Sequence, residues 1–383
     1  MRQVDVLIVG GGPAGSTLAW SLRDSGLAVT ILDKQTFPRD KVCAGWVTPA
    51  VMEELQINLD DYAKGRTLQP ISGFRVSQLG KKEVETHYHD KPISYGIRRC
   101  EFDDYLLQRS GAELVLGQAF KSMVWQGDSW LVNDNIQARL VVGAGGHFCP
   151  VARAVGAKLG RQEQVVAAQE IEFRMTAAQL RECQIDAQVP ELFFTPDLIG
   201  YGWVFRKGDY LNIGLGREDN HKLSDHVQNF CQFLKQQGKI PADTPDKFHG
   251  HAYLLYPHAI REVVKDGVLL IGDAAGLAYP QSGEGIRPAV ESALLAAQVI
   301  RTCDGDFQQT RLQPYYVKLV ARFGERQPKA GLLERLPLGV KQALAGQLMQ
   351  TRWFTRHIVM DRWFLHSQQA PLSDQTSQDS SLS

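Results

Sequence analysis

Three glycines near the start of the chain are spaced to bind a dinucleotide. Gly10, Gly12 and Gly15 form the pattern G-x-G-x-x-G, and Pro13 and Ala14 stand between the last two. The first glycine permits a tight turn, the second lets the backbone approach a pyrophosphate, and the third lets a helix pack closely on a strand. The free N–H groups at the start of the following helix would face the phosphates.

The elements expected around this turn are those that a dinucleotide fold requires. Residues 4–9 form an almost continuous apolar run, which is typical of a strand buried in a parallel sheet, and residues 16–22 have helical character. A second buried strand is expected over residues 28–33. It ends in Asp33, which is placed to bind a ribose, and Lys34 follows. This order makes the prediction specific, but it does not separate NAD from FAD.

Later segments supply further candidate cofactor-binding residues. These are Arg39, Lys41, Val42, Cys43 and Ala44, then Arg99, then Gly143, Ala144 and Gly145, then Gly272, Asp273 and Ala274, and finally Pro280, Gly283, Glu284, Gly285 and Ile286. In this order the segments resemble the FAD fingerprints of the superfamily that holds the aromatic hydroxylases, the flavin halogenases and the geranylgeranyl reductases. The resemblance covers most of residues 4–299 and implies an FAD-dependent oxidoreductase.

The resemblance implies roles for several of these residues. Asp273 would bind the ribityl chain of FAD, and Arg99 would lie near its phosphates. A helix that begins near Gly283 would point its positive N-terminus at the flavin pyrimidine ring. Gly145 stands where the hydroxylases carry an acid that affects nicotinamide use, and the sequence has no second G-x-G-x-x-G. NAD(P)H is therefore expected only as a transient donor, and reduction by a partner is the alternative.

Three side chains are candidates for the catalytic site. Cys43 lies in K-V-C-A-G, which is similar to the K-x-C-G-G segment that places a cysteine beside the flavin in geranylgeranyl reductases. It would donate a proton there, or it is a small buried thiol. Trp46 replaces the small residue that those reductases prefer, which would narrow a prenyl channel and suit an aromatic target. Trp203 lies in a segment similar to the W-x-F-x-K-G hairpin of the reductases.

The order of the segments predicts an α/β fold with three parts. A doubly wound FAD-binding domain is expected from residues 1–70, 97–158 and 262–305, and an inserted antiparallel β-sheet substrate domain from residues 71–96 and 159–261. A helical C-terminal layer is expected over residues 306–366, and a disordered polar tail over residues 367–383.

Composition excludes several classes of protein. Of 383 residues, 44% are hydrophobic and 22% are charged, which is ordinary for a folded chain. The 42 lysines and arginines equal the 42 aspartates and glutamates, so nucleic acid is not an expected partner. The N-terminal sequence lacks a signal-peptide pattern and the six cysteines are scattered, which indicates a cytoplasmic protein. No metal site is expected.

The charge is uneven along the chain. Residues 311–366 hold ten lysines and arginines against three acidic residues, together with Trp353 and Trp363. Such a segment could contact a membrane surface or an acidic partner. The alternative is a layer that turns its aromatic residues inward and its basic residues to water.

The sequence favours a flavin monooxygenase acting on an aromatic or bulky apolar target. The K-V-C-A-G-W and G-A-G-G-x-x-C-P strings resemble flavoproteins that hydroxylate a tryptophan of a partner protein to mature a tryptophylquinone oxidase. A small aromatic substrate is equally compatible with these residues. One alternative is reduction of isoprenoid C=C bonds, as in the geranylgeranyl reductases. Another is a flavin-binding assembly factor without redox chemistry.

Overall fold

The computed structural model describes residues 1–157, 163, 165–219, 221–259, 261–326 and 344–372. The chain divides into two compact units, each built from three stretches of sequence. Unit 1 holds Met1–Asp40, Cys100–Val165 and Tyr253–Pro328, and unit 2 holds Lys41–Arg99, Val166–Ala252 and Lys329–Ser383. Residues 41–70, expected with the FAD-binding half, thus cluster in unit 2.

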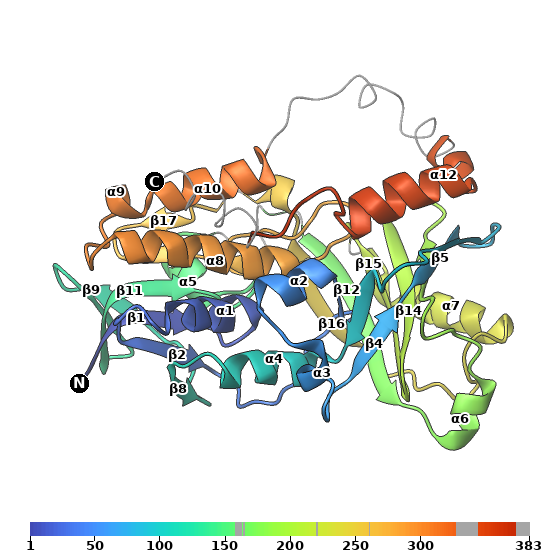
Figure 1. Cartoon of the computed structure of the whole chain (residues 1–383), viewed down its shortest axis with the longest axis horizontal. Coiled ribbons are helices and arrows are strands. Elements are labelled where there is room, and N and C mark those ends of the chain that lie inside the picture. The colour runs from blue at the N-terminus through green and yellow to red at the C-terminus, as the bar shows by residue number, and fades with distance from the viewer. Residues whose placement is uncertain (158–162, 164, 220, 260, 327–343, 373–383) are drawn as a thin grey trace. The chain divides into compact units, whose positions relative to one another are not determined.

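Unit 1 is built on an eight-stranded sheet, in the order β17-β18-β11-β1-β2-β8 with β10 and β9 attached to β11 (Figure 1). Strands β18, β11, β1, β2 and β8 are mutually parallel. The apolar run of β1 explains its central place, because Val6, Leu7 and Ile8 are fully buried. The strands are β1 (Arg2–Val9), β2 (Val29–Asp33), β8 (Glu113–Leu116), β9 (Met123–Trp125), β10 (Trp130–Val132), β11 (Ile136–Gly143), β17 (Val264–Lys265) and β18 (Val268–Leu270).

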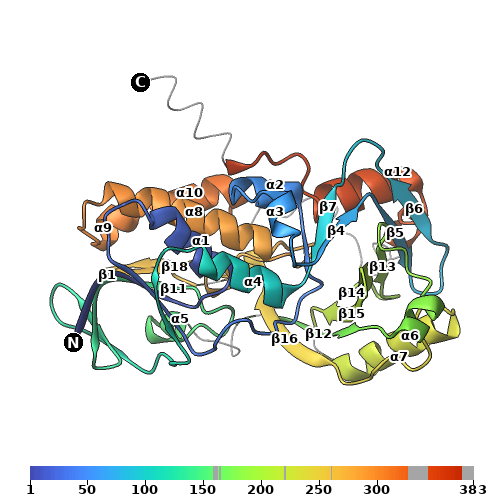
Figure 2. The ribbon, with the colours of Figure 1, turned by 60° about the horizontal axis from the view of Figure 1, so that its bottom comes forward.

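Helices cover this sheet. The longest described helix of unit 1, α8, packs against both α1 and α10, and Figures 1 and 2 show the three together. Small residues such as Ala293, Ala296 and Ala297 on α8 are buried, which allows this close approach. The helices of this part are α1 (Pro13–Leu22), α4 (Arg99–Gln108), α5 (Pro150–Ala154), η1 (Tyr256–His258), η2 (Gly272–Ala274), α8 (Ile286–Thr302), α9 (Gln309–Leu312) and α10 (Pro314–Phe323).

Unit 2 contains a mostly antiparallel sheet of seven strands, in the order β16-β12-β15-β14-β13-β5-β6. A smaller sheet has the order β3-β7-β4. The strands are β3 (Trp46–Val47), β4 (Leu68–Ile71), β5 (Gly73–Gln78), β6 (Val84–His87), β7 (Ser94–Ile97), β12 (Val165–Arg174), β13 (Glu191–Phe194), β14 (Gly200–Lys207), β15 (Tyr210–Arg217) and β16 (His249–Leu254).

The two faces of the larger sheet differ because successive side chains of a strand point to opposite faces. On one face, Ile171, Val204 and Ile213 join the hydrophobic core with helix α7, whose Val227, Phe230 and Leu234 recur at helical spacing (Figure 2). The residues that alternate with these strand positions point to the other face: Glu170, Glu172, Trp203, Phe205, Lys207 and Asn212. The expected hairpin is confirmed, since Gly208 and Asp209 join β14 to β15.

Helices complete unit 2. They are α2 (Pro49–Glu54), α3 (Leu59–Tyr62), α6 (Ala177–Glu182), α7 (Leu223–Gln236), α12 (Arg352–Phe354) and the π-helix η4 (Thr355–Phe364). The parallel sheet, the antiparallel sheet and the C-terminal helices confirm the predicted fold class. Most of the predicted tail, residues 373–383, lies outside the described residues, as do Lys329, Arg335 and Lys341 of the basic segment. In the described part of the chain, no helix has both the length and the apolar character to cross a membrane.

Candidate functional site

The turn from β1 to α1 requires glycine for steric reasons. Gly10 has a φ of +118°, and a Cβ there would lie 2.4 Å from the carbonyl oxygen of Ala144. A Cβ on Gly15 would lie 1.9 Å from the carbonyl oxygen of Gly10. On Gly12, by contrast, a Cβ would approach only the Arg39 side chain, at 3.4 Å. A Cβ on Gly12 would therefore not clash with the protein itself. The absence of a side chain at Gly12 leaves the outer surface of the turn open.

The start of α1 has the properties of a phosphate site. Pro13 and Ala14 begin the helix, and Gly12, its N-cap, provides no side-chain hydrogen bond to the first turn. The first N–H groups of a helix have no partner inside the helix, so they remain available to an anion. Arg39 lies beside Gly12 and forms an ion pair with Asp103, with Nη1 3.2 Å from Oδ2. A guanidinium at this position adds positive charge beside the turn.

Asp33 is fixed at the end of β2 by backbone donors. Its Oδ2 accepts from the Gly11 N–H at 2.7 Å, and its Oδ1 accepts from the Gln35 N–H at 2.8 Å. The carboxylate is partly exposed, and each oxygen keeps further acceptor capacity. This arrangement suits the predicted ribose contact. Lys34, the next residue, is exposed.

The second cofactor segment places Asp273 at the start of a long helix. Gly272, Asp273 and Ala274 form the turn η2 after β18, and Gly272 has a φ of +58°. A Cβ on Gly285, the N-cap of α8, would lie 3.0 Å from Asp273 Oδ1. The carboxylate therefore lies beside the first residues of α8, where Ile286 begins the helix and no side chain caps it. The start of α8 brings the positive end of a helix next to this acceptor, which fits a flavin and its hydroxylated chain.

Glu284 adds a buried acid just before α8. Among the described residues its carboxylate oxygens have no side-chain donor, and the group that approaches them is the backbone N–H of Arg287. Burial raises its pKa to about 8 despite the nearby Arg287 charge. Arg287 instead pairs with Glu291, at 2.7 Å, and Arg322 pairs with the same carboxylate. Because Glu284 is mainly protonated at neutral pH, it does not neutralise the positive end of α8.

A buried ion pair stabilises the η2 turn by binding its backbone. Arg261 binds Glu163 through two nitrogens, at 2.6 and 2.8 Å, and its Nη1 donates to the carbonyl oxygen of Ala274 at 2.9 Å. Its Nη2 lies 3.1 Å from His147 Nδ1. Since a guanidinium only donates, Nδ1 must be the accepting nitrogen of this imidazole. Burial, and then the Arg261 charge, lower the pKa of His147 to about 4, so the ring is neutral.

The glycine segment after β11 lies against the first glycine turn. Gly143 ends β11 and is followed by Ala144 and Gly145, and a Cβ on Gly143 would lie 3.0 Å from Cys149 Sγ. Cys149 is fully buried, and burial raises the pKa of its thiol. The segment therefore packs on a structural thiol and leaves no room for a side chain at Gly143.

In unit 2, the Cys43 loop rests on the polar face of the larger sheet. Cys43 is partly buried, and its Sγ lies 3.4 Å from the Gly45 amide nitrogen. Its carbonyl oxygen accepts from Asn212 Nδ2 at 3.1 Å. Lys207 passes so close to Gly45 that a Cβ there would lie 2.4 Å from Nζ. Lys207 Nζ donates a hydrogen bond to Glu172 Oε1 at 2.8 Å.

Both candidate tryptophans lie in the interior of unit 2. Trp46 is surrounded by the rings of Phe74, Phe205 and Phe364, with centroids 5.1, 6.0 and 6.1 Å away. The Trp203 indole nitrogen donates to Asn212 Oδ1 at 2.8 Å. Trp203 thus orients the Asn212 amide, which binds the Cys43 carbonyl oxygen. Trp46, three residues after Cys43, belongs instead to an aromatic cluster.

The remaining predicted residues are placed as follows. Lys41 Nζ lies 2.8 Å from His251 Nε2, and Arg99 is buried at the start of α4. Val42, Ala44, Pro280 and Gly283 are partly buried. Gly283 has a φ of +66° and lies against Tyr253, whose hydroxyl would be 2.3 Å from a Cβ there.

Sequence reasoning missed the buried polar residues that support these segments. They are His147, Glu163 and Arg261 in unit 1, and Glu170, Lys207 and Asn212 in unit 2, together with the partly buried Glu172. A signal existed for one pair. Glu170 and Glu172 flank Ile171 in a strand pattern, so two acids had to share the face opposite a core residue.

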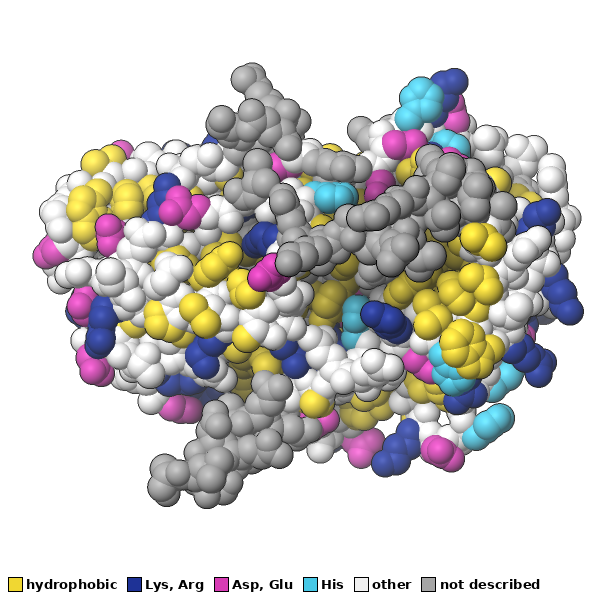
Figure 3. Space-filling model, turned by 90° about the horizontal axis from the view of Figure 1, so that it is seen from above, with side chains coloured by type: hydrophobic (Ala, Val, Ile, Leu, Met, Phe, Trp, Pro, Cys, Tyr) yellow, Lys and Arg dark blue, Asp and Glu magenta, His cyan; other side chains and the backbone are white. Residues whose placement is uncertain are grey.

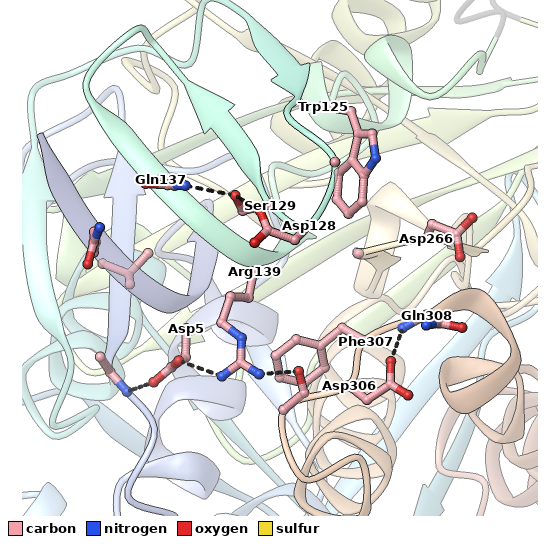
Figure 4. A pocket seen from close by; sticks show the side chains of 16 residues that line it. Asp5, Trp125, Asp128, Ser129, Gln137, Arg139, Asp266, Asp306, Phe307 and Gln308 are labelled. Atoms are coloured by element: carbon pink, nitrogen blue, oxygen red, sulfur yellow. Dashed lines mark hydrogen bonds and ion pairs between the residues drawn. The ribbon is translucent and has the colours of Figure 1, made fainter.

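An open groove of about 610 Å³ lies elsewhere on unit 1 (Figure 4). It is lined by residues at the start of β1, including Asp5, whereas the glycine turn follows the end of that strand. Asp5 forms an ion pair with Arg139, with Oδ1 3.1 Å from Nη1, and Asp128, Asp266 and Asp306 also line the groove. None of the predicted cofactor or catalytic residues lines it.

Comparison with known proteins agrees with this geometry. A family model described as an FAD binding domain matches residues 3–76 and 131–319. Geranylgeranyl diphosphate reductase of Rhodobacter capsulatus is 30% identical over 311 residues, which cover 77% of this chain and 74% of that protein.

Two solved structures share the fold. A geranylgeranyl bacteriochlorophyll reductase-like protein of Thermoplasma acidophilum matches with a TM-score of 0.70 and 21% identity, over 91% of this chain and 88% of that one. The probable FAD-dependent monooxygenase pqsL of Pseudomonas aeruginosa matches with a TM-score of 0.65 and 17% identity, over 85% of this chain and 98% of that one.

Proposed function

The chain belongs to the FAD binding domain family and is an FAD-dependent oxidoreductase, and from this premise we propose that it is a monooxygenase that hydroxylates an aromatic ring. The preferred target is a tryptophan side chain of a partner protein that matures into a quinone cofactor. A small aromatic molecule is the simpler form of the same target.

The observation that carries this proposal is the setting of Trp46. Its ring meets those of Phe74 and Phe205 at steep angles, 78° and 63°, and contacts Phe364 as well. An indole wedged among three rings cannot swing aside, because protein interiors are close-packed. Next to the Cys43 loop, Trp46 would therefore form a fixed aromatic boundary of the substrate site. Such a boundary suits a flat ring, since aromatic pairs gain from offset or edge-to-face contact, and it takes space from a long isoprenoid chain.

The net reaction balances with one oxygen molecule. One oxygen atom enters a ring C–H bond to give C–OH, and the other leaves as water, with two electrons and two protons consumed. Bound FAD supplies the two-electron and oxygen chemistry of this reaction. The electrons come from NAD(P)H bound transiently or from a partner, because the sequence has a single dinucleotide fingerprint and Gly145 in place of an acid.

The chain's own groups would bind and orient the reactants. The starts of α1 and α8 would hold the negative parts of FAD, and Asp33 and Asp273 would accept from its hydroxyl groups. Glu284, neutral at pH 7, leaves the positive end of α8 available to a negatively charged reduced ring. Cys43 would hold or donate a proton at Sγ.

A second candidate is reduction of an isoprenoid C=C bond, which Cys43 favours. In that reaction a hydride reaches one carbon and a proton from Sγ reaches the other. The partly buried thiol, with a backbone N–H directed at its sulfur, would suit a proton donor. The Rhodobacter capsulatus relative carries the name of a reductase of this kind.

The C-terminal segment of unit 2 is the proposed docking surface for a partner protein. Trp353 is 66% exposed, and Leu344 and Leu348 are also exposed. Arg352, Arg356 and Arg362 are exposed on the same segment. Figure 3 shows apolar side chains beside basic and histidine side chains on one face of the molecule. An acidic partner fits this combination, and a membrane surface is the other outcome to be tested.

Isotope labelling separates the candidate reactions. The purified flavoprotein is reduced without air, then mixed with ¹⁸O₂ and either a tryptophan-containing quinoprotein precursor or a polyprenyl substrate. One ¹⁸O atom in the tryptophan peptide supports the monooxygenase, and two added hydrogen atoms in the polyprenyl product support the reductase. If neither product formed and reoxidation yielded only hydrogen peroxide, the proposed targets would be contradicted. Reduction by NADPH alone is expected to be slow until the target is added.

A further inference from the structure

A buried polar cluster of Glu170, Asn212 and Trp203 contacts the Cys43 loop, and all of these residues belong to unit 2. Glu170 and Asn212 are 6% and 1% exposed. Asn212 Nδ2 donates to Glu170 Oε2 at 3.0 Å and to the Cys43 carbonyl oxygen at 3.1 Å. The Glu170 carboxyl also receives the backbone N–H of Cys43. Glu170 therefore binds both backbone polar groups of Cys43. It accepts directly from the N–H, and the Asn212 amide links it to the carbonyl oxygen.

The orientation of the Asn212 amide follows from its neighbour. Trp203 offers an indole N–H, which can only donate, and it lies 2.8 Å from the Asn212 side chain. The atom facing Trp203 must be the amide oxygen, so the amide nitrogen must face Glu170 and Cys43. The link from Glu170 to the Cys43 carbonyl thus has a fixed direction.

The two glutamates of this face have different surroundings. Glu172 forms ion pairs with Lys207 at 2.8 Å and with Arg98 at 3.4 Å, and it accepts a long hydrogen bond from Asn212 Nδ2, also at 3.4 Å. No cation among the described residues forms an ion pair with Glu170, whose hydrogen bonds come from neutral donors. The charged groups that act on it are Lys207 on β14 and Glu172 on its own strand. Burial raises the pKa of Glu170 to about 7, more than these neighbours lower it.

Protonation changes what Glu170 can hold. An ionised carboxylate accepts both N–H groups in charge-assisted bonds, which are roughly twice as strong as neutral ones. A protonated carboxyl is a weaker acceptor, and one of its oxygens becomes a donor. We propose that Glu170 is the positioning residue of the Cys43 loop, which it holds firmly when ionised and releases when protonated. The inference rests on the proposed function in taking this loop as part of the reacting site.

Labelling of Cys43 tests the proposal without turnover. The flavoprotein is treated with iodoacetamide across about pH 5–9, a range that spans the ordinary and shifted titration of a carboxyl, and the Cys43 peptide is quantified by mass spectrometry. Glu170→Gln is nearly isosteric and cannot ionise. Its labelling rate relative to wild type should be near one at low pH and should rise several-fold above pH 7. Glu172→Gln is the matched control and should show no such step.

A ratio that stays flat through pH 7 in Glu170→Gln, or the same step in Glu172→Gln, would overturn the proposal. Hydrogen exchange of the wild-type peptide that spans Cys43 gives a second measurement, which remains valid if a variant fails to fold. After correction for the intrinsic effect of pH, protection relative to a core peptide of unit 2 should fall several-fold as pH drops through 7, because only the loop is released. Constant relative protection would refute the proposal. Neither measurement requires oxygen insertion, so failure of the proposed reaction would leave both results intact.

Discussion

The two units form their candidate sites in different ways. In unit 1 the site is made of backbone, because Gly10 and Gly15 have no room for a side chain, the start of α1 offers N–H groups and the start of α8 presents the positive end of a helix. In unit 2 it is made of buried side chains, since Glu170, Asn212 and Trp203 hold the Cys43 loop. An added side chain would disrupt the first kind of site by steric clash. The second kind depends on the charge of Glu170 and therefore on pH.

The largest expected effect is that of Gly15→Ala. The new Cβ would lie 1.9 Å from the carbonyl oxygen of Gly10, and backbone at both ends of this contact cannot yield cheaply. We expect a loss of more than about 4 kcal/mol in the free energy of unfolding, the range of the severest single substitutions. Thermal melting of the apoprotein and flavin content after purification measure it.

Two glycine variants sharpen this result. Gly12→Ala meets only the Arg39 side chain, at 3.4 Å, so the apoprotein should melt as wild type does while FAD affinity falls. Gly250→Ala meets nothing within 4 Å and should change neither quantity. If Gly12→Ala bound FAD normally, the turn would not be the phosphate site.

Cys43→Ser tests the side-chain chemistry of unit 2. If Sγ supplies a proton, single-turnover rate should fall by roughly 10²–10⁴-fold, the usual contribution of a positioned acid. The fold should change little, because the loop is held by its backbone atoms. Cys100→Ser is the control, as another partly buried cysteine. An unchanged rate combined with a stability loss of about 1–3 kcal/mol would make Cys43 a structural thiol.

The sequence was sufficient to predict the parallel sheet of unit 1 and its glycine turn because these features depend on local sequence. Gly10, Gly12 and Gly15 specify backbone conformations within a few residues, and the apolar run before them specifies a buried strand. The same holds for the Gly272–Asp273 turn. Each motif carries its own elements, so the spacing of a few residues was enough to predict the parallel sheet and a dinucleotide cofactor. The resemblance of the later segments to known flavoproteins then indicated FAD.

The cluster of unit 2 has no such local code. Cys43, Glu170 and Asn212 are far apart in sequence and meet through the antiparallel register that pairs Glu172 with Asn212. Alternation along β12 showed that Glu170 and Glu172 share a face, but not which residues lie opposite. The His147–Arg261–Glu163 contact likewise joins residues that are far apart in sequence, here from segments outside the helices and strands of unit 1.

Stability should show the pH dependence of unit 2 directly. Burial raises the pKa of Glu170 from 4.5 to about 7 in the folded state, so the folded protein binds this proton more tightly than the unfolded chain. Its contribution to stability is full below pH 4.5 and is lost as pH rises through about 7. Glu170→Gln should remove this loss, so that its stability relative to wild type rises by about 3 kcal/mol across the window.

Denaturant unfolding at several pH values measures this difference. Glu172→Gln, which leaves Glu170 in place, should keep the wild-type slope over the same window even if it lowers stability by breaking the Lys207 pair. Parallel pH profiles for Glu170→Gln and wild type would show that the Glu170 proton is not bound more tightly in the folded state.

The smallest effect belongs to Asp273, which brings a side chain into the backbone site of unit 1. Asp273→Ala removes an acceptor for FAD hydroxyl groups, and a hydrogen bond to a charged group contributes about 1.5–3 kcal/mol. The Kd for FAD should therefore rise roughly 10- to 100-fold. The turn itself should persist, since Arg261 holds the backbone carbonyl of Ala274 and not the carboxylate. The apoprotein should lose only about 0.3–1 kcal/mol, because a carboxylate beside the start of α8 is mildly stabilising. Asp273→Asn keeps an acceptor oxygen and should bind FAD with intermediate affinity, as measured by fluorescence titration of the apoprotein. Wild-type affinity in Asp273→Ala would mean that backbone alone makes the cofactor site of unit 1.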